Sequence, residues 1–222
     1  SLAEMPINIA LFPILVFIPK FYTGEMGVPL ALAANIILAV RIFDVFTDPI
    51  VGYINDRTNT KWGRRRPWIA MATPLLMVSI YMLFIPPEGA GALHLFLWMF
   101  LLSIATTMLI IPYYAWGAEL SPDYNERSRI TGWRSISGVV GSLSAQLIPT
   151  IALVFFGLGG STNVLYIVGI ASVIIMPICV FLTVLKVPES KDYVQSNISP
   201  IKGFKIMLEN SPFKRLIMAF MF

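Results

Sequence analysis

The sequence is poor in charge and holds almost no cysteine or histidine. Asp, Glu, Lys and Arg make up 13% of its 222 residues, against about a quarter in a typical soluble domain. Its one Cys and one His exclude a disulfide framework and a His/Cys metal cluster within the chain. We expect no cleavable signal peptide, because apolar sequence begins almost directly after Ser1. No nucleophile paired with a base is visible either, so an enzyme is not expected.

Hydrophobic residues are abundant instead, at 57% of the chain with a mean hydropathy of +0.77. A helix needs about 20 mostly apolar residues to cross a bilayer. Such runs predict membrane spans over residues 3–23, 29–55, 67–86, 92–119, 130–157 and 163–186. A seventh run begins near Phe213 and stops at Phe222, so we expect the chain to be incomplete.

The predicted organisation is an all-α membrane protein in three parts. Residues 1–186 form a six-helix transmembrane domain, 187–212 form a cytoplasmic middle loop, and 213–222 begin a seventh transmembrane helix. The middle loop is rich in proline and polar residues, and residues 201–208 could form a short amphipathic helix in it. We therefore expect the N-terminal half of a larger helix bundle, with its C-terminal half missing.

The basic residues sit on one side of this predicted arrangement. The loops after the second, fourth and sixth spans carry Lys and Arg, whereas residues 86–91 and 157–163 carry none. By the positive-inside rule, the basic side and the N-terminus are cytoplasmic. The net charge of +4 is thus explained by membrane topology, and no nucleic-acid partner is expected.

Two acids interrupt the second span. Asp44 and Asp48 lie four residues apart, which places them on one face of a helix. Transfer of an Asp to the bilayer centre costs about 2.5–3.5 kcal/mol even on low insertion scales. Arg41, one turn earlier, could neutralise one acid but leaves the other needing a proton or a cation. The pair is therefore a candidate cation or proton site.

A glycine and a basic cluster follow the acid pair. The motif residues are Gly52, Asp56, Arg57, Gly63, Arg64 and Arg65. Gly52 is expected to allow close helix contact, and Asp56 to pair with an arginine in a gating role. Arg64–Arg66 are expected to anchor the loop among cytoplasmic headgroups. The motif resembles the signature between helices 2 and 3 of the major facilitator superfamily.

The detailed pattern is more specific. It comprises RIFDVFTDPIVG (41–52), WGRRRPW (62–68), IPYYAWGAEL (111–120), NERSR (125–129) and GWR (132–134). This set, in this order, resembles the glycoside–pentoside–hexuronide:cation symporter family, to which the melibiose permease belongs. The resemblance covers essentially the whole chain and implies six helices built as two three-helix repeats related by inversion.

The resemblance implies a cation site in the second helix. In sodium-coupled members the two acids coordinate the cation, which gives Asp44 and Asp48 that role. Thr47 and Thr107 match the positions that complete the site. Thr47 replaces an amide of the melibiose permease, but both threonines still offer oxygen to a hard cation. Sodium or a proton would be the coupling ion, and no cofactor is expected.

The implied solute site departs from the family. Asn8 and Ile110 stand where the melibiose permease has sugar-binding acids, so only Asn8 can still form hydrogen bonds there. Tyr114 matches an aromatic residue that lines the sugar pocket. Arg134 matches an arginine near the pocket and could bind an anionic group or serve gating. Asn8, Tyr114 and Arg134 are thus the candidate substrate residues.

The expected function is cation-coupled symport of a small polar solute, most simply a sugar or sugar derivative, by alternating access. The expected surroundings are membrane lipids, the C-terminal half of the same transporter and, from the family, a bacterial inner membrane. Two alternatives remain open. One is a carrier of lysolipid-like amphiphiles, and the other is a non-transporting membrane subunit bound to a partner complex.

Overall fold

The computed structural model describes residues 3–157, 161–188 and 209–211, with only the backbone considered at Phe156 and Ser161. The chain divides into two units, Ser1–Ser190 and Lys191–Phe222. Only residues 209–211 are described in the second unit. The middle loop, the helix expected over 201–208 and the start of the seventh span therefore lie largely outside the described residues.

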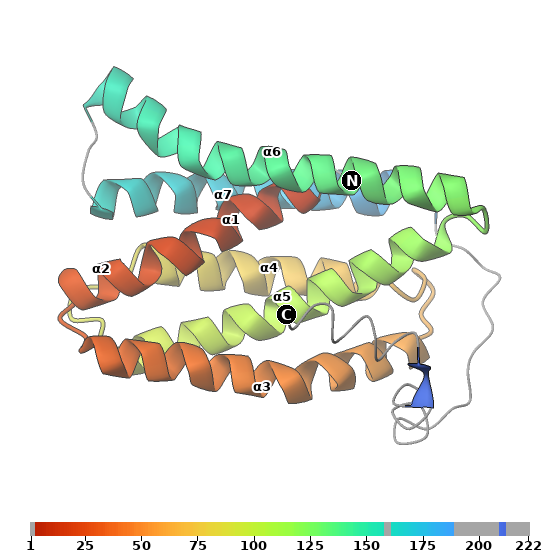
Figure 1. Cartoon of the computed structure of the whole chain (residues 1–222), viewed down its shortest axis with the longest axis horizontal. Coiled ribbons are helices and arrows are strands. Elements are labelled where there is room, and N and C mark those ends of the chain that lie inside the picture. Colours follow the sequence, from red (N-terminus) through yellow and green to blue (C-terminus); the bar gives the residue numbers. More distant parts are fainter. Residues whose placement is uncertain (1–2, 158–160, 189–208, 212–222) are drawn as a thin grey trace. The chain divides into compact units, whose positions relative to one another are not determined.

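Helices account for nearly all of the first unit (Figure 1). Within the described residues they are α1 (Glu4–Val16), α2 (Ile18–Gly24), α3 (Leu30–Arg57), α4 (Arg66–Phe84), α5 (Ala92–Glu119), α6 (Tyr124–Phe156) and α7 (Ser161–Lys186). The five from α3 to α7 are each long and apolar enough to cross a membrane. The bent pair α1–α2 can supply a sixth span. The all-α fold is confirmed, and the helix ends lie within about two residues of the predicted spans, except that α6 begins at Tyr124, six residues before the predicted 130.

The first predicted span is broken at Phe17, where α1 and α2 meet at an angle of 43°. Pro13 lies inside α1, and Pro19 lies at the start of α2. A proline removes a backbone donor and clashes with the preceding turn, which bends a helix. Backbone hydrogen bonds from Phe17 to Pro13 (2.7 Å) and from Phe21 to Phe17 (2.8 Å) continue across the break.

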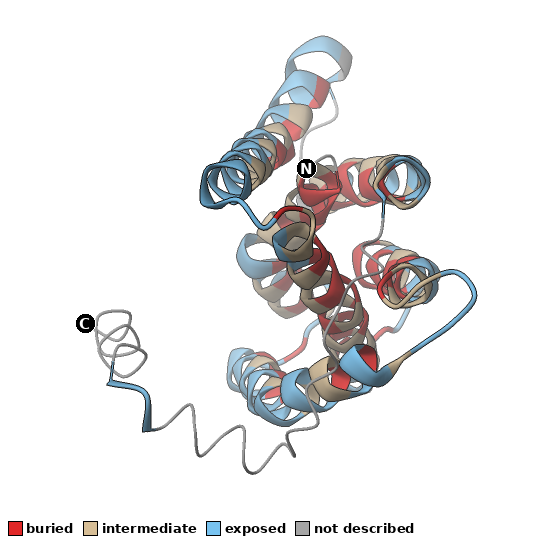
Figure 2. Cartoon of the chain, turned by 90° about the vertical axis from the view of Figure 1, so that its right-hand side faces the viewer, coloured by how far each residue is buried: buried red, intermediate tan, exposed pale blue. Residues whose placement is uncertain are grey.

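Long helices pack along their lengths around a shared interior. Helix α5 packs against α3 and α4, α7 packs against α4 and α1, and α6 packs mainly against α1. Figure 2 shows buried residues on the inner sides of the helices and exposed residues outside. Large buried side chains include Tyr22, Phe84 and Trp116, and the Tyr22 hydroxyl donates to the Leu83 carbonyl at 3.3 Å.

Two glycines allow the closest helix contacts. A Cβ added at Gly141 of α6 would lie 2.3 Å from the Met5 carbonyl oxygen of α1. A Cβ at Gly169 of α7 would lie 2.7 Å from Cβ of Phe84. Small residues let helix backbones approach in membranes, where packing drives association. These two contacts hold α6 to α1 and α7 to α4.

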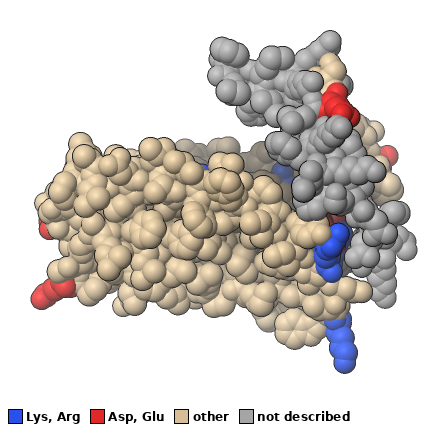
Figure 3. All heavy atoms as spheres, turned by 90° about the horizontal axis from the view of Figure 1, so that it is seen from below, with Lys and Arg blue, Asp and Glu red and all other residues tan. Residues whose placement is uncertain are grey.

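Much of the outer surface is apolar. Exposed residues on α6 include Trp133, Ile136, Val139, Leu143 and Leu147. Figure 3 shows a broad uncharged face, with charged side chains near its two ends. Such a surface is unusual for a soluble protein, but it fits lipid or further transmembrane helices. The chain is therefore an integral membrane protein.

Candidate functional site

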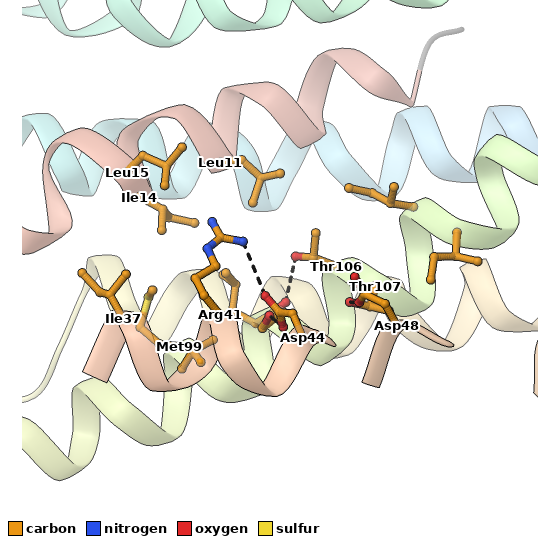
Figure 4. A pocket seen from close by; sticks show the side chains of 15 residues that line it. Leu11, Ile14, Leu15, Ile37, Arg41, Asp44, Asp48, Met99, Thr106 and Thr107 are labelled. Atoms are coloured by element: carbon orange, nitrogen blue, oxygen red, sulfur yellow. Dashed lines mark hydrogen bonds and ion pairs between the residues drawn. The ribbon is translucent and has the colours of Figure 1, made fainter. Parts of the chain in front are cut away.

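A cavity of about 280 Å³ lies between α1, α3 and α5. Apolar side chains line most of it, including Leu11 and Ile14 from α1. Its polar wall holds Asp44 and Asp48 of α3 opposite hydroxyl side chains of α5 (Figure 4). The predicted acid pair thus faces one cavity, as the four-residue spacing indicated.

Two hydroxyls of α5 reach the two acids. Thr107 Oγ1 donates to Asp48 Oδ1 at 2.7 Å. Ser103 Oγ donates to Asp44 Oδ1. Because Ser103 and Thr107 are four residues apart, they share one face of α5 just as the acids share one face of α3. The result is two carboxylate–hydroxyl pairs, stacked one helical turn apart.

Arg41 contributes a partial counter-charge. Its Nη1 lies 3.5 Å from Asp44 Oδ2, and its side chain is 62% exposed while that of Asp44 is 17% exposed. An ion pair with such an exposed partner contributes little, about 0–1 kcal/mol. Within the described residues, no arginine or lysine pairs with Asp48. One negative charge in the cavity is therefore left without a basic partner there.

The oxygen-rich wall has the chemistry of a site for a hard cation. Sodium and similar ions prefer carboxylate and hydroxyl oxygens. In the described part of the chain, no group of three or more His, Cys, Asp or Glu could hold a metal ion. Any ligands beyond the two carboxylates of this cavity would therefore be hydroxyls or other neutral oxygens.

Not every predicted residue reaches this cavity. Thr47 donates its hydroxyl back to the Phe43 carbonyl at 3.2 Å, and its side chain is absent from the cavity wall. Its role as a ligand stays a prediction. Ser103, which the sequence analysis did not single out, takes the hydroxyl position on Asp44. A polar residue one turn before Thr107 was the available signal.

The three predicted solute residues meet elsewhere, around Glu4 at the start of α1. The Tyr114 hydroxyl donates to Glu4 Oε1 at 2.8 Å, and Asn8 Nδ2 donates to the Glu4 carbonyl at 2.9 Å. The guanidinium carbon of Arg134 lies 4.1 Å from the centre of the Tyr114 ring, a cation–π distance. The structure thus brings Asn8, Tyr114 and Arg134 together, and it adds Glu4, whose depth the sequence left open.

The loop motif forms a charge network with the end of α5. Arg65 pairs with Asp56 at 2.8 Å and with Glu119 at 2.7 Å, and Arg64 pairs with Glu119 at 2.6 Å. The side chains of Arg64 and Arg65 are only 11% and 4% exposed. The expectation that they anchor the loop among headgroups is wrong for these two residues. A buried guanidinium group needs a carboxylate partner, and Glu119 is a partner of both arginines.

The other motif residues have local roles. Gly63 has φ 111° and closes the turn with Thr60, a backbone conformation that side chains disfavour. Arg57 stacks on the Tyr53 ring at 4.1 Å. Gly52 faces Ile111 of α5, but a Cβ added at Gly52 would lie 3.8 Å from Ile111 Cγ2, which is an ordinary van der Waals distance. In this conformation Gly52 is not at a tight contact.

Comparison with known proteins gives a consistent result. Residues 1–222 match the family described as MFS/sugar transport protein. The chain is 28% identical to the putative glycoside/cation symporter YagG of Escherichia coli (strain K12) over 90% of its length. It is 29% identical to the isoprimeverose transporter of Lactiplantibacillus pentosus over 96% of its length.

A mammalian protein also matches. The chain is 27% identical to the sodium-dependent lysophosphatidylcholine symporter 1 of Mus musculus over 93% of its length. The matched regions make up 44%, 46% and 46% of these three relatives. The chain therefore spans less than half the length of the relatives it matches.

Proposed function

Because this chain belongs to the MFS/sugar transport protein family, we propose that it forms the N-terminal half of a cation-coupled symporter. The cargo is a sugar or sugar derivative, and the coupling ion is sodium or a proton. The proposal depends above all on one observation: Asp44 and Asp48 face a common cavity, where Thr107 hydrogen-bonds Asp48 at 2.7 Å. Names of relatives such as the isoprimeverose transporter support the sugar.

The mechanism follows from the charge of the cavity. When both carboxylates are ionised, their repulsion and their desolvation oppose closure of the helices around an empty site. A bound cation removes this penalty and favours the conformation that binds solute. Solute and cation then raise each other's affinity by the same factor. Rocking of this half against the C-terminal half alternates access to the solute.

The proposal includes the surroundings of the protein. The partners are membrane lipids and the C-terminal half of the same transporter. The N-terminus and the basic loops lie on the cytoplasmic side, in a bacterial inner membrane. Besides the coupling ion, the proposed site includes no cofactor.

The proposal is tested by thermal unfolding of the purified full-length protein, titrated with sodium at constant ionic strength and at several pH values. Binding to the folded state raises the unfolding temperature. We expect a saturable, sodium-specific increase that Asp44→Asn and Asp48→Asn abolish. The control is Glu88→Gln, which removes an exposed acid from the loop between α4 and α5. It should respond as wild type does.

Each outcome points to a different reading. A pH-dependent shift that needs the two aspartates, without a sodium effect, would assign coupling to protons. No response to sodium or pH would overturn the cation site. It would favour a non-transporting subunit, which should co-purify with a partner complex.

Ser103 is proposed as a further ligand of the cation. Its hydroxyl donates to Asp44, whereas the neighbouring Thr106 donates to the Leu102 carbonyl of its own helix at 2.7 Å. Both residues line the cavity. We expect Ser103→Ala to weaken sodium binding about tenfold, the value of one hydrogen bond to a charged group. Thr106→Ala is the matched control, and equal effects of the two variants would remove Ser103 from the site.

A second candidate cargo is a lysolipid-like amphiphile. Ile110 lines the cavity where the melibiose permease has an acid, and Leu11, Ile14 and Leu15 form an apolar wall opposite the acids. One matched relative is named as a lysophosphatidylcholine symporter. Competition separates the two cargoes. Sodium-dependent stabilisation by isoprimeverose or a glucuronide supports the sugar, and stabilisation by lysophosphatidylcholine alone supports the amphiphile.

A further inference from the structure

Glu4 is a buried acid with an incomplete set of partners. Glu4 lies in the first turn of α1 and is only 8% exposed. Tyr114 donates to Oε1 at 2.8 Å. Within the described residues, Oε2 is buried and has no hydrogen-bond partner. A buried polar atom without a partner destabilises the folded state, and more so when it is charged.

A second polar atom nearby is also incomplete. In the described part of the chain, the Tyr113 hydroxyl is buried and has no hydrogen-bond partner. Tyr113 and Tyr114 are neighbours on α5 with ring centres 5.9 Å apart, and Tyr113 lies close enough to Glu4 to interact electrostatically with it. We call Glu4, Tyr113, Tyr114 and Arg134 the Glu4 cluster.

Arg134 supplies the positive charge of the cluster without pairing to the acid. It stacks on the Tyr114 ring at 4.1 Å, and among the described residues it forms no ion pair with an acid. The cluster therefore presents an open acceptor on Glu4, an open hydroxyl on Tyr113 and open donors on Arg134. A ligand that satisfies all three must both donate and accept hydrogen bonds at neighbouring atoms.

We propose that Glu4 is a substrate-recognition carboxylate that binds hydroxyl groups of a polyhydroxylated solute, together with Tyr113 and Arg134. Each sugar hydroxyl offers one donor and two acceptor sites. One hydroxyl donates to Glu4 Oε2, and a neighbouring hydroxyl accepts from Arg134 while it pairs with Tyr113. This inference rests on the proposed function, since it names the residues that recognise the proposed sugar.

The cluster is closed in the conformation described here. Tyr113 and Arg134 border a cavity of only about 40 Å³, whereas small-molecule pockets usually span about 300–1,000 Å³. A Cβ added at Gly138 of α6 would lie 3.3 Å from the Glu4 side chain, so α6 covers the acid closely. In this conformation a solute reaches Glu4 only if the start of α1 and α6 move apart locally.

The cluster is tested in the full-length protein by two variants and one control. Glu4→Gln keeps the shape and an acceptor for Tyr114 but removes the charge. Tyr113→Phe removes a hydroxyl that has no partner among the described residues. Glu88→Gln removes an exposed loop acid and serves as the control. For each, we measure thermal stabilisation by pentoses, hexoses, their disaccharides including isoprimeverose, and glucuronides at saturating sodium.

We expect Glu4→Gln and Tyr113→Phe to weaken binding of the sugar that stabilises wild type best, by about tenfold or more for Glu4→Gln. In both variants, the affinity for sodium without sugar should stay within about twofold of the wild-type value. If Tyr113 had only a structural role, Tyr113→Phe would leave sugar affinity unchanged, because the lost hydroxyl has no hydrogen-bond partner among the described residues.

Three results would overturn the inference. They are wild-type sugar affinity in Glu4→Gln, wild-type sugar affinity in Tyr113→Phe, and a wild-type protein that binds sodium but none of the sugars. All three leave the cation site standing. Failure of the proposed function is distinct, since it shows as loss of the sodium response in wild type.

Discussion

Thr107 on α5 donates a 2.7 Å hydrogen bond to Asp48 on α3, a residue 59 positions earlier in the chain. This bond joins two helices at the acid pair, and in the described part of the chain the other carboxylate oxygen of Asp48 has no hydrogen-bond donor. Any movement between α3 and α5 would change this contact. The proposed cation site and the packing of α3 against α5 therefore share this contact.

The Thr107 hydroxyl should matter for cation binding. Thr107→Val keeps the shape of the side chain but removes the donor to Asp48 and a potential ligand oxygen. We expect sodium affinity to fall about tenfold, as for loss of one hydrogen bond to a charged group. Sodium-dependent thermal unfolding measures this. Thr106→Val is the control, because in the described part of the chain Thr106 hydrogen-bonds only the Leu102 carbonyl of its own helix, and an equal loss there would contradict the prediction.

Arg41 should oppose cation binding. Its guanidinium lies 3.5 Å from Asp44 and competes with a cation for that carboxylate. Because Arg41 is 62% exposed, its attraction to Asp44 is small, about 0–1 kcal/mol. We expect Arg41→Gln to tighten sodium binding by about two- to fivefold. Arg57→Gln, which removes a positive charge at the end of the same helix, should leave the midpoint of a sodium titration unchanged. Weaker binding in Arg41→Gln would show that Arg41 holds Asp44 in place instead.

Glu119 should stabilise the protein more than Asp56 does. Glu119 pairs with both Arg64 and Arg65, whereas Asp56 pairs with Arg65 from a position that is 62% exposed. Removal of a partner from buried charges costs up to about 3–5 kcal/mol, reduced here because Glu119 is 30% exposed. Exposed pairs contribute about 0–1 kcal/mol.

Thermal unfolding of Glu119→Gln and Asp56→Asn without ligand compares the two acids. We expect a clear decrease in unfolding temperature for Glu119→Gln and little change for Asp56→Asn. Equal decreases would mean that the network is held from the Asp56 side.

Gly141 should not tolerate a side chain. The Cβ of Gly141→Ala would lie 2.3 Å from the Met5 carbonyl, which forces α1 and α6 apart. Overpacking of this kind costs about 1–3 kcal/mol. Gly132→Ala on the same helix meets nothing within 4 Å and should be neutral or slightly stabilising, since Ala favours helix. Unfolding temperatures in detergent test this pair, and an unchanged Gly141→Ala would mean that the contact opens readily.

The predicted family and the all-α fold are confirmed by the family match and by the helices. Both could be read from the sequence for a simple reason. A membrane helix must satisfy its own backbone and present about 20 apolar residues to lipid, so length and hydropathy alone locate it. The bend at Phe17 was less visible, because Pro13 and Pro19 predict a kink but not its angle.

Contacts between helices were the part that local patterns could not supply. The i, i+4 spacing placed Asp44 and Asp48 on one face, but it did not identify Ser103 as the partner of Asp44. Periodicity also said nothing of the depth of Glu4, which depends on α5 and α6 packing over it. The sequence predicts Arg64 and Arg65 as headgroup anchors, because it does not show that both pair with Glu119, more than 50 residues away.

The sequence by itself determined which segments are helices and which acids share a helix face, because these properties depend on nearby residues along the chain. Only the tertiary structure decided that α3 and α5 set two carboxylates against two hydroxyls, and that Glu4 lies buried beside Tyr114. Such pairings join residues far apart in the chain. They are selected by packing and by the need to satisfy buried polar groups, which no local pattern records.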